Sequence, residues 1–147
     1  MFLPSIIRFL HKGLDLLIEE LEGYENEENI WRIGGEIKNS AGILTYHLIG
    51  NLNHFIGQEI GKNGYQRNRP LEFSIKYVPR TELIEMIQAT KQMISTVLSR
   101  MEASELTQPS PVAFTTIRVD NMLDYLLHLH GHLQWHLGQI NYHRRLV

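Results

Sequence analysis

Residues 120–146 combine a helical apolar pattern with a parallel row of histidines. At about 100° per residue, the apolar positions recur on one side of an α-helix and the histidines lie in the adjoining arc of roughly 80°. An apolar stripe of this length has to be buried against other helices. The apolar arc consists of Met122, Leu126, Leu129, Leu133, Leu137 and Ile140, and the polar row of Asn121, Tyr125, His128, His132, His136, Gln139 and His143.

His132 and His136 are the pair in this row with the clearest chemical meaning. Side chains four residues apart share a helix face, with Cβ atoms about 5–6 Å apart. Two imidazoles at that spacing can hold one metal ion, as in the H-E-x-x-H zinc motif, although no glutamate follows the first histidine here. The alternative is that the histidines lie in the core or on a solvated flank. A metal site would need a third ligand from elsewhere in the chain.

Composition narrows the functional class. The chain of 147 residues has the length of a single domain, which we expect to span residues 1–147. A formal charge of −2 gives no basic surface for nucleic acid. The absence of cysteine excludes disulfides, thiolate ligands and a cysteine nucleophile. It also suits an intracellular protein, so we expect a cytoplasmic location.

The first 22 residues predict a helix of the mature protein and not a signal peptide. Arg8, Lys12 and Asp15 interrupt each apolar run, while leucine and isoleucine recur with helical spacing over about residues 3–22. No segment approaches the roughly 18 uninterrupted apolar residues of a membrane span. We therefore expect no membrane partner.

The rest of the chain predicts three more helices. The second begins at Asn39 or Ser40 and runs for about 20 residues. The third is capped by Thr81 and covers residues 81–102, and the last begins near Asp120. Residues 23–39 are expected to be an exposed connection, and residues 61–80 a non-helical link long enough to cross the molecule. These features predict an all-α four-helix bundle with a long crossover between helices 2 and 3.

A second polar row lies on the predicted second helix, beside its apolar arc. His47, Asn51, His54 and Gln58 fall within roughly 60° of one another. If the two rows face each other across a cleft, His47 or His54 completes a three-histidine site, and spacing alone does not choose between them. Three imidazoles plus water form an open coordination sphere of the catalytic type. The alternative is that both polar rows are solvent-exposed sides of their helices and bind no metal.

Three segments resemble the DinB-like superfamily, in its bacillithiol-transferase-like and uncharacterised bacterial branches. The segments are HLIGNLNHFIG (47–57), YQRNRPLEF (65–73) and HGHLQWHLGQINYHRR (130–145). In that superfamily one histidine of the second helix and an H-x-x-x-H-x-G-Q motif of the last helix bind a divalent metal. The resemblance implies that His47, His132 and His136 are the metal ligands. Leu137 departs from the pattern, since many members have arginine there.

The resemblance also implies an activity, the transfer of a low-molecular-weight thiol to a small electrophile. Zinc or nickel suits three imidazoles best, and a cysteine-free chain needs an external thiol. The alternatives are a metal-dependent hydrolase of a small molecule and a non-catalytic metal-binding bundle. We expect a small-molecule substrate and a homodimer, and no residue is assigned as catalytic.

Arg67, Arg69 and Tyr125 are the candidate substrate-binding residues. The two guanidinium groups can hold a carboxylate or phosphate in a bidentate way, or else pair with Glu72 or with the acidic residues 25–29. Tyr125 lies on the histidine row and can donate a hydrogen bond to a ligand of the metal, or simply form the cleft wall. Gln139 and Asn51 are candidates to orient a ligand imidazole.

Overall fold

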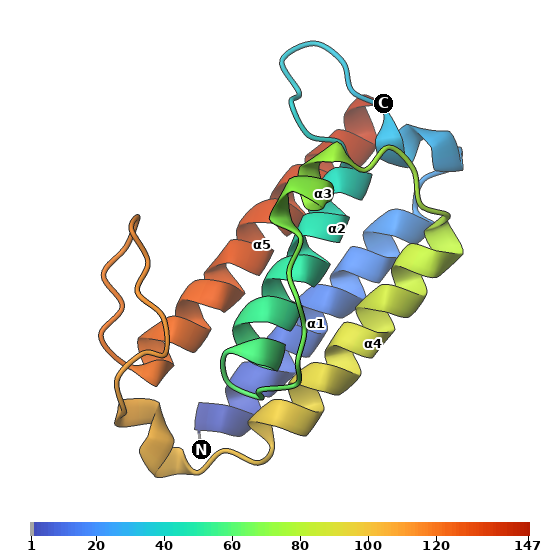
Figure 1. The fold of residues 1–147 in the computed structure, drawn as a ribbon. Coiled ribbons are helices and arrows are strands. Elements are labelled where there is room, and N and C mark those ends of the chain that lie inside the picture. The colour runs from blue at the N-terminus through green and yellow to red at the C-terminus, as the bar shows by residue number, and fades with distance from the viewer. Residues whose placement is uncertain (1) are drawn as a thin grey trace.

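The computed structural model describes residues 2–147, and it confirms the all-α class. No β-strand forms within these residues; the nearest feature is a single bridge between Pro109 and Asn121. Shorter helical segments include the 3-10 turns η1 (Glu27–Trp31) and η3 (Ala103–Thr107) and the π-helical η2 (Asn53–Gln58). The α-helices are α1 (Phe2–Glu22), α2 (Ala41–Leu52), α3 (Arg69–Ser74), α4 (Arg80–Leu98) and α5 (Met122–Leu146) (Figure 1).

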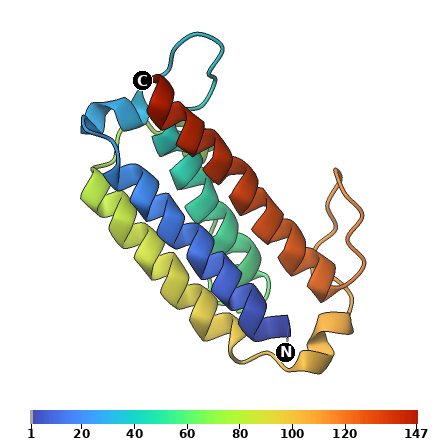
Figure 2. The same cartoon turned by 180° about the vertical axis from the view of Figure 1, so that it is seen from behind.

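The four longest helices lie alongside one another, and the two termini are at opposite ends of the molecule (Figures 1 and 2). Helix α1 packs against α4 and α5, whereas α2 packs against α3, α4 and α5. The contact between α2 and α5 brings His47 of one polar row beside His132 and His136 of the other. No helix within residues 2–147 combines the length and apolarity needed to cross a membrane.

Helix α1 is a central part of the core, as its periodicity predicted. Leu10, Leu14, Leu17 and Leu21 recur at intervals of four, three and four residues and are all fully buried. This spacing keeps them on one helix face, which packs against α4 and α5. The prediction of a core helix over residues 3–22 is therefore confirmed.

The expectation that residues 61–80 contain no helix is wrong for residues 69–74, which form α3. The Asn68 side chain accepts a hydrogen bond from the Leu71 amide at 3.1 Å, and Pro70 lies in the first turn. An asparagine cap followed by proline is a helix-start signal, because proline lacks only an amide that would be unpaired there anyway. Five α-helices are thus present within residues 2–147, where four were predicted.

The predicted cap of the third long helix is also wrong. Helix α4 begins at Arg80, with Pro79 in the cap position, so Thr81 lies inside the helix. The Arg80 amide instead donates to Oε1 of Glu27 at 2.8 Å. The helix ends at Leu98, four residues before the predicted boundary of 102. A carboxylate distant in sequence thus replaces the local cap.

Residues 23–39 are only partly the exposed connection that was expected. Tyr24 and Ile30 are buried, and η1 crosses the end of the helices. The Tyr24 hydroxyl donates to Nδ1 of His143 at 2.6 Å, and Nε2 of His143 donates to the Arg32 carbonyl at 2.8 Å. One histidine of α5 therefore fixes this connection at two points.

The second predicted helix begins as expected but changes its winding. Ser40 is the N-cap of α2, and after Leu52 the helix continues as the π-helical η2. In η2 the Glu59 amide bonds to the His54 carbonyl, five residues back, at 2.9 Å. The Tyr125 hydroxyl donates to the Phe55 carbonyl at 2.8 Å. This hydrogen bond connects α5 to η2, at the end of the second predicted helix.

Ser40→Ala is expected to destabilise the protein by about 1 kcal/mol. The Ser40 hydroxyl accepts a hydrogen bond from the Ile43 amide at 3.2 Å in a buried position, and alanine leaves that amide without its partner. Chemical denaturation measures the loss. Ser40→Thr is the control, because threonine keeps a hydroxyl that can accept the hydrogen bond from the Ile43 amide. Equal losses in the two variants would contradict a capping role.

Candidate metal centre

Three histidines from two helices converge on one point. His47 comes from α2, and His132 and His136 come from consecutive turns of α5. The Nε2 atom of His132 lies 3.3 Å from Nε2 of His47 and 3.1 Å from Nε2 of His136. His54, the other residue that spacing allowed, lies apart from this cluster, with its Nε2 3.9 Å from a Glu59 carboxylate oxygen.

These separations suit a shared metal ion. Imidazole nitrogens that bind tetrahedral zinc at about 2.0–2.1 Å are separated from one another by about 3.3–3.4 Å. The two closest pairs in the cluster, at 3.3 and 3.1 Å, are near that value. The ligand atoms of all three histidines lie within 4.8 Å of one another.

The hydrogen bonds behind the rings determine which nitrogens face the centre. Nδ1 of His47 donates to Oε2 of Glu72 at 2.8 Å, and Nδ1 of His136 donates to Oε1 of Gln139 at 2.7 Å. Since a neutral imidazole carries one proton, both Nε2 atoms present lone pairs to His132. Nε2 of His132 can donate to only one of them, so one close pair would oppose two lone pairs. A cation among the three nitrogens removes that repulsion, and the donor set therefore fits a divalent metal.

Burial keeps the three imidazoles neutral. It is the main cause that lowers the pKa of His47 and of His136, against the opposing hydrogen bonds from Glu72 and Gln139. For His132, burial and then the neighbouring His136 and His47 lower the pKa to about 3. A histidine binds metal only in its neutral form. At neutral pH the three imidazoles are therefore in the form that can bind a metal.

Glu72 is the residue of the site whose role the sequence did not reveal. It lies on α3, is only 2% exposed, and accepts hydrogen bonds from Arg67 Nε at 2.7 Å and Arg67 Nη2 at 2.9 Å in addition to His47. Carboxylates that hold the outer nitrogen of a metal-binding histidine fix the ring and raise its basicity. The Asn68–Pro70 helix-start signal was the available clue, because it places Glu72 in the first turn of a short helix.

Gly50 provides the space that Glu72 occupies. A Cβ atom added at Gly50 would meet Oε1 and Cδ of Glu72 well inside van der Waals distance. Gly50 therefore lets a neighbouring segment approach α2 closely. The structure shows that the neighbour is α3 and that the group in closest approach is the carboxylate of the His47–Glu72–Arg67 network.

Of the three predicted substrate-binding residues, Arg67 and Tyr125 both contact Phe55, whereas Arg69 packs on Phe73. Arg67 makes the bidentate pair with Glu72 that the sequence left open as an alternative. Arg69 is exposed, with its guanidinium carbon 5.6 Å from the Phe73 ring centre. Tyr125 is fully buried, and its hydroxyl donates to the Phe55 carbonyl. Their role in binding substrate stays a prediction.

Of the two candidates to orient a ligand ring, Gln139 contacts His136 as described. Asn51 has a buried Oδ1 atom without a hydrogen-bond partner within residues 2–147. The Nδ1 atom of His132 is likewise buried without a hydrogen-bond partner within residues 2–147. Polar atoms that are buried without partners are uncommon.

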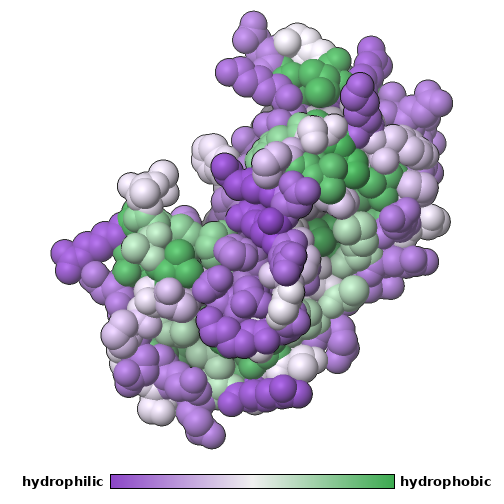
Figure 3. Space-filling model, in the orientation of Figure 1, coloured by the Kyte–Doolittle hydropathy of each residue, from purple (hydrophilic) through white to green (hydrophobic). Residues whose placement is uncertain are grey.

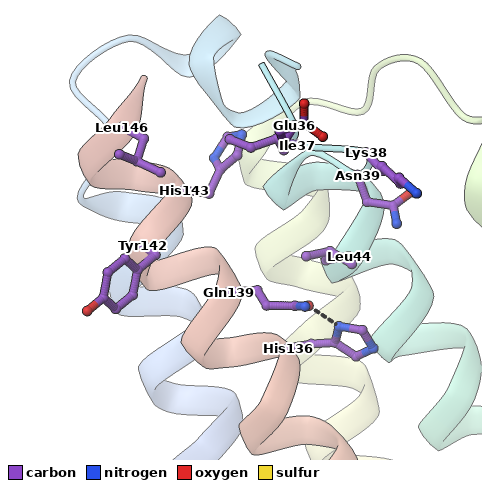
Figure 4. Close-up of a pocket in the computed structure, with 10 residues that line it drawn as sticks. All are labelled: Glu36, Ile37, Lys38, Asn39, Leu44, His136, Gln139, Tyr142, His143 and Leu146. Carbon is purple, nitrogen blue, oxygen red and sulfur yellow. Dashed lines mark hydrogen bonds between the residues drawn. The ribbon is translucent and has the colours of Figure 1, made fainter. Parts of the chain in front are cut away.

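A groove opens next to the histidines, between the C-terminal half of α5 and the start of α2 (Figure 4). Its volume is about 450 Å³, and His136 and Gln139 line its inner end. In the space-filling view, a hydrophilic band crosses the middle of the face that Figure 1 presents, between areas of apolar surface (Figure 3). The groove therefore borders one histidine of the cluster, His136, whereas His132 borders a separate cavity lined by His128, Gly131 and Trp135.

Comparison with known proteins gives a family match. The family model described as "Protein of unknown function (DUF1572)" matches residues 5–147, a range that includes all three histidines and Glu72. No curated protein and no solved structure matches the chain. Because the family match covers nearly the whole sequence, the chain belongs to the DUF1572 family.

Proposed function

We propose that the protein is a metal-dependent transferase of the DinB-like type, built as a four-helix bundle with a crossover. His47, His132 and His136 hold zinc or nickel, and the reaction joins a low-molecular-weight thiol to a small electrophile. The observation that carries the proposal is the convergence of three Nε2 atoms, with the outer nitrogens of His47 and His136 held by Glu72 and Gln139. A site of three neutral imidazoles is open to a further ligand.

The charge around the site favours a thiolate as that ligand. A divalent ion bound by neutral ligands supplies two uncompensated positive charges, which deprotonate a coordinated thiol readily. The Arg67 charge is balanced by Glu72 at 2.7 Å, so this pair does not offset the charge of the ion. The chain has no cysteine of its own. The sulfur nucleophile therefore has to be a small molecule.

The position of Glu72 favours thiol transfer over hydrolysis. A hydrolase would need a general base within reach of the attacking water. Glu72 is the carboxylate nearest to the histidines, but its two oxygens already accept from His47 and twice from Arg67. A carboxylate occupied in this way positions a ligand and is not free to accept a proton.

Titrating cobalt-substituted protein with small thiols tests the proposal. We expect a sulfur-to-metal charge-transfer absorption that saturates with thiol, and conjugation of the same thiol to a small electrophile in an activity assay. A variant without His47, His132 and His136 is the control and should show neither effect. Thiols that leave the cobalt spectrum unchanged would refute thiol transfer, and turnover of esters without any thiol would instead support hydrolysis.

A further inference from the structure

The outer side of α5 carries a row of large apolar side chains that are more than half exposed. In Figure 2 α5 runs along the front of the molecule, and no other helix lies over its outer side. The Tyr142 ring points away from Leu44 and the rest of the bundle in Figure 4. Single exposed apolar residues are common, but a row of them on one helix indicates an interaction surface. The row consists of Leu127 (52% exposed), Trp135 (68%), Tyr142 (67%) and Leu146 (68%).

Two glycines lie within this row. Gly131 and Gly138 are separated from the large residues on either side by three or four positions, so they share the same side of the helix. A Cβ atom added at either glycine would meet nothing within 4 Å. Packing within residues 2–147 therefore does not require a glycine at either position, and alanine would favour the helix more. The two glycines leave hollows between the large side chains.

The row is complementary to itself when two copies of α5 run antiparallel. In a pair with two-fold symmetry, residue i of one copy faces residue j of the other, and residue j faces residue i in turn. One register places each aromatic ring over a glycine and each leucine beside a leucine. The facing pairs in this register are Trp135 with Gly138, Tyr142 with Gly131, and Leu127 with Leu146. A parallel pair would instead place ring against ring and glycine against glycine.

The charges at the ends of α5 favour the same orientation. Asp124 lies in the first turn of the helix and Arg145 in its last turn. Neither forms an ion pair with another side chain in the part of the chain that the structure describes. In the antiparallel register Arg145 faces His128, so it comes within one helical turn of Asp124 of the other copy. A parallel pair would place like charges beside each other, which is unfavourable.

A hollow beside α5 offers space for the last turn of a second copy. It lies between α5 and residues 116–119, has a volume of about 990 Å³, and is lined by Ile117, Leu127 and Gly131 among others. Leu127 and Gly131 are the residues that face Leu146 and Tyr142 in the antiparallel register. His132 also borders the hollow. A second copy would therefore close one side of the cavity next to the metal centre.

The area of the row suits a dimer. An aromatic side chain buries about 150–250 Å² in an interface, and Trp135 and Tyr142 are two-thirds exposed. Together with the two leucines, they expose on the order of 500 Å² in each copy. The helix backbone at the glycines and the Ile117 side chain add to this area. The sum approaches the roughly 800 Å² per partner of a standard interface.

We propose that the protein forms a homodimer in which the outer side of α5 packs antiparallel against the same side of a second copy. Trp135 of each subunit fills the hollow at Gly138 of the other, and Tyr142 fills the hollow at Gly131. The family resemblance implied only that a dimer forms, whereas the α5 surface defines the interface and its register. The inference does not depend on the metal or on thiol chemistry.

Gly138→Glu and Ala89→Glu are the matched variants for the interface. Both place a glutamate at a small, exposed residue of a helix, but Ala89 lies on α4, which packs against α1 and α2. Sedimentation equilibrium of the full-length protein should give dimers for wild type and for Ala89→Glu. Gly138→Glu should raise the dissociation constant about 100-fold or more, because two carboxylates would be buried against the Trp135 rings. Circular dichroism should show an unchanged fold, since a side chain at position 138 meets no atom of its own chain.

A mixture of two variants tests the register. In a dimer of one Gly138→Leu chain and one Trp135→Ala chain, the new leucine faces the space that the missing indole leaves, and the other pair stays native. In either homodimer both pairs are mismatched. The heterodimer should therefore be about 10-fold or more stable than either homodimer. Native mass spectrometry of the mixture, compared with the proportions that random exchange gives, measures this preference.

Three results would overturn the inference. The first is a wild-type protein that stays monomeric at every concentration. The second is a dimer that Gly138→Glu weakens no more than Ala89→Glu does, because the subunits would then meet through another surface. The third is random exchange between the Gly138→Leu and Trp135→Ala chains, which would exclude the contact between positions 135 and 138. Loss of dimers in Gly138→Glu alone, together with the preferred heterodimer, supports the proposal.

Discussion

His132→Ala is expected to remove nearly all bound metal from the purified protein. His132 is the middle residue of the cluster, since its Nε2 atom approaches both His47 and His136. Two histidines on separate helices remain after the change, and they no longer enclose an ion on three sides. Metal analysis of tag-free protein should fall from about one divalent ion per chain, the value for a mononuclear site, to a trace.

His54→Ala is the matched control for that experiment. His54 occupies the same polar row as His47 but lies outside the cluster, so its removal should leave the metal content unchanged. Loss of metal in His54→Ala with retention in His47→Ala would show that the ligand assignment is wrong. Full occupancy in a variant without His47, His132 and His136 would exclude the site altogether.

Features that depend on local spacing were predictable from the sequence. The His132–His136 pair follows from a separation of four residues on one helix, and the core face of α1 follows from its leucine periodicity. The sequence limited the cap of α2 to Asn39 or Ser40 by their place before an apolar run, and the structure shows that it is Ser40. Each of these inferences needs only the geometry of a single helix.

Features that depend on distant contacts were not predictable in this way. Spacing allowed His47 or His54 as the third ligand, because the choice depends on how α2 is rotated against α5. The resemblance to the DinB-like superfamily selected His47, which the structure brings to the cluster. Helix α4 is capped by the distant Glu27, and no pattern around Thr81 contains that information.

Glu72 combines a local and a distant feature. Its helix could have been recognised from Asn68 and Pro70, but its contact with His47 depends on the path of the link that leads from η2 to α3. The same contact requires a glycine at position 50 of α2. The sequence contained both signals, and only the packing of α3 on α2 connects them.

Glu72→Gln is expected to lower the metal affinity by about 10- to 100-fold, the usual effect of losing the partner behind a ligand histidine. Glutamine has nearly the same size, but its neutral amide has one acceptor oxygen for the three hydrogen bonds that His47 and Arg67 donate to Glu72. The His47 ring loses a charged partner and becomes less basic toward the ion. Competition with a chromophoric chelator measures the change.

Glu59→Gln is the control for Glu72→Gln, because Glu59 lies near His54 and outside the cluster. Gly50→Ala provides a second route to the same effect, since the added methyl group displaces the Glu72 carboxylate while the carboxylate itself remains. Wild-type affinity in both Glu72→Gln and Gly50→Ala, with melting temperatures that show folded protein, would contradict the role of Glu72. Reduced affinity in both would show that the position of the carboxylate matters as well as its charge.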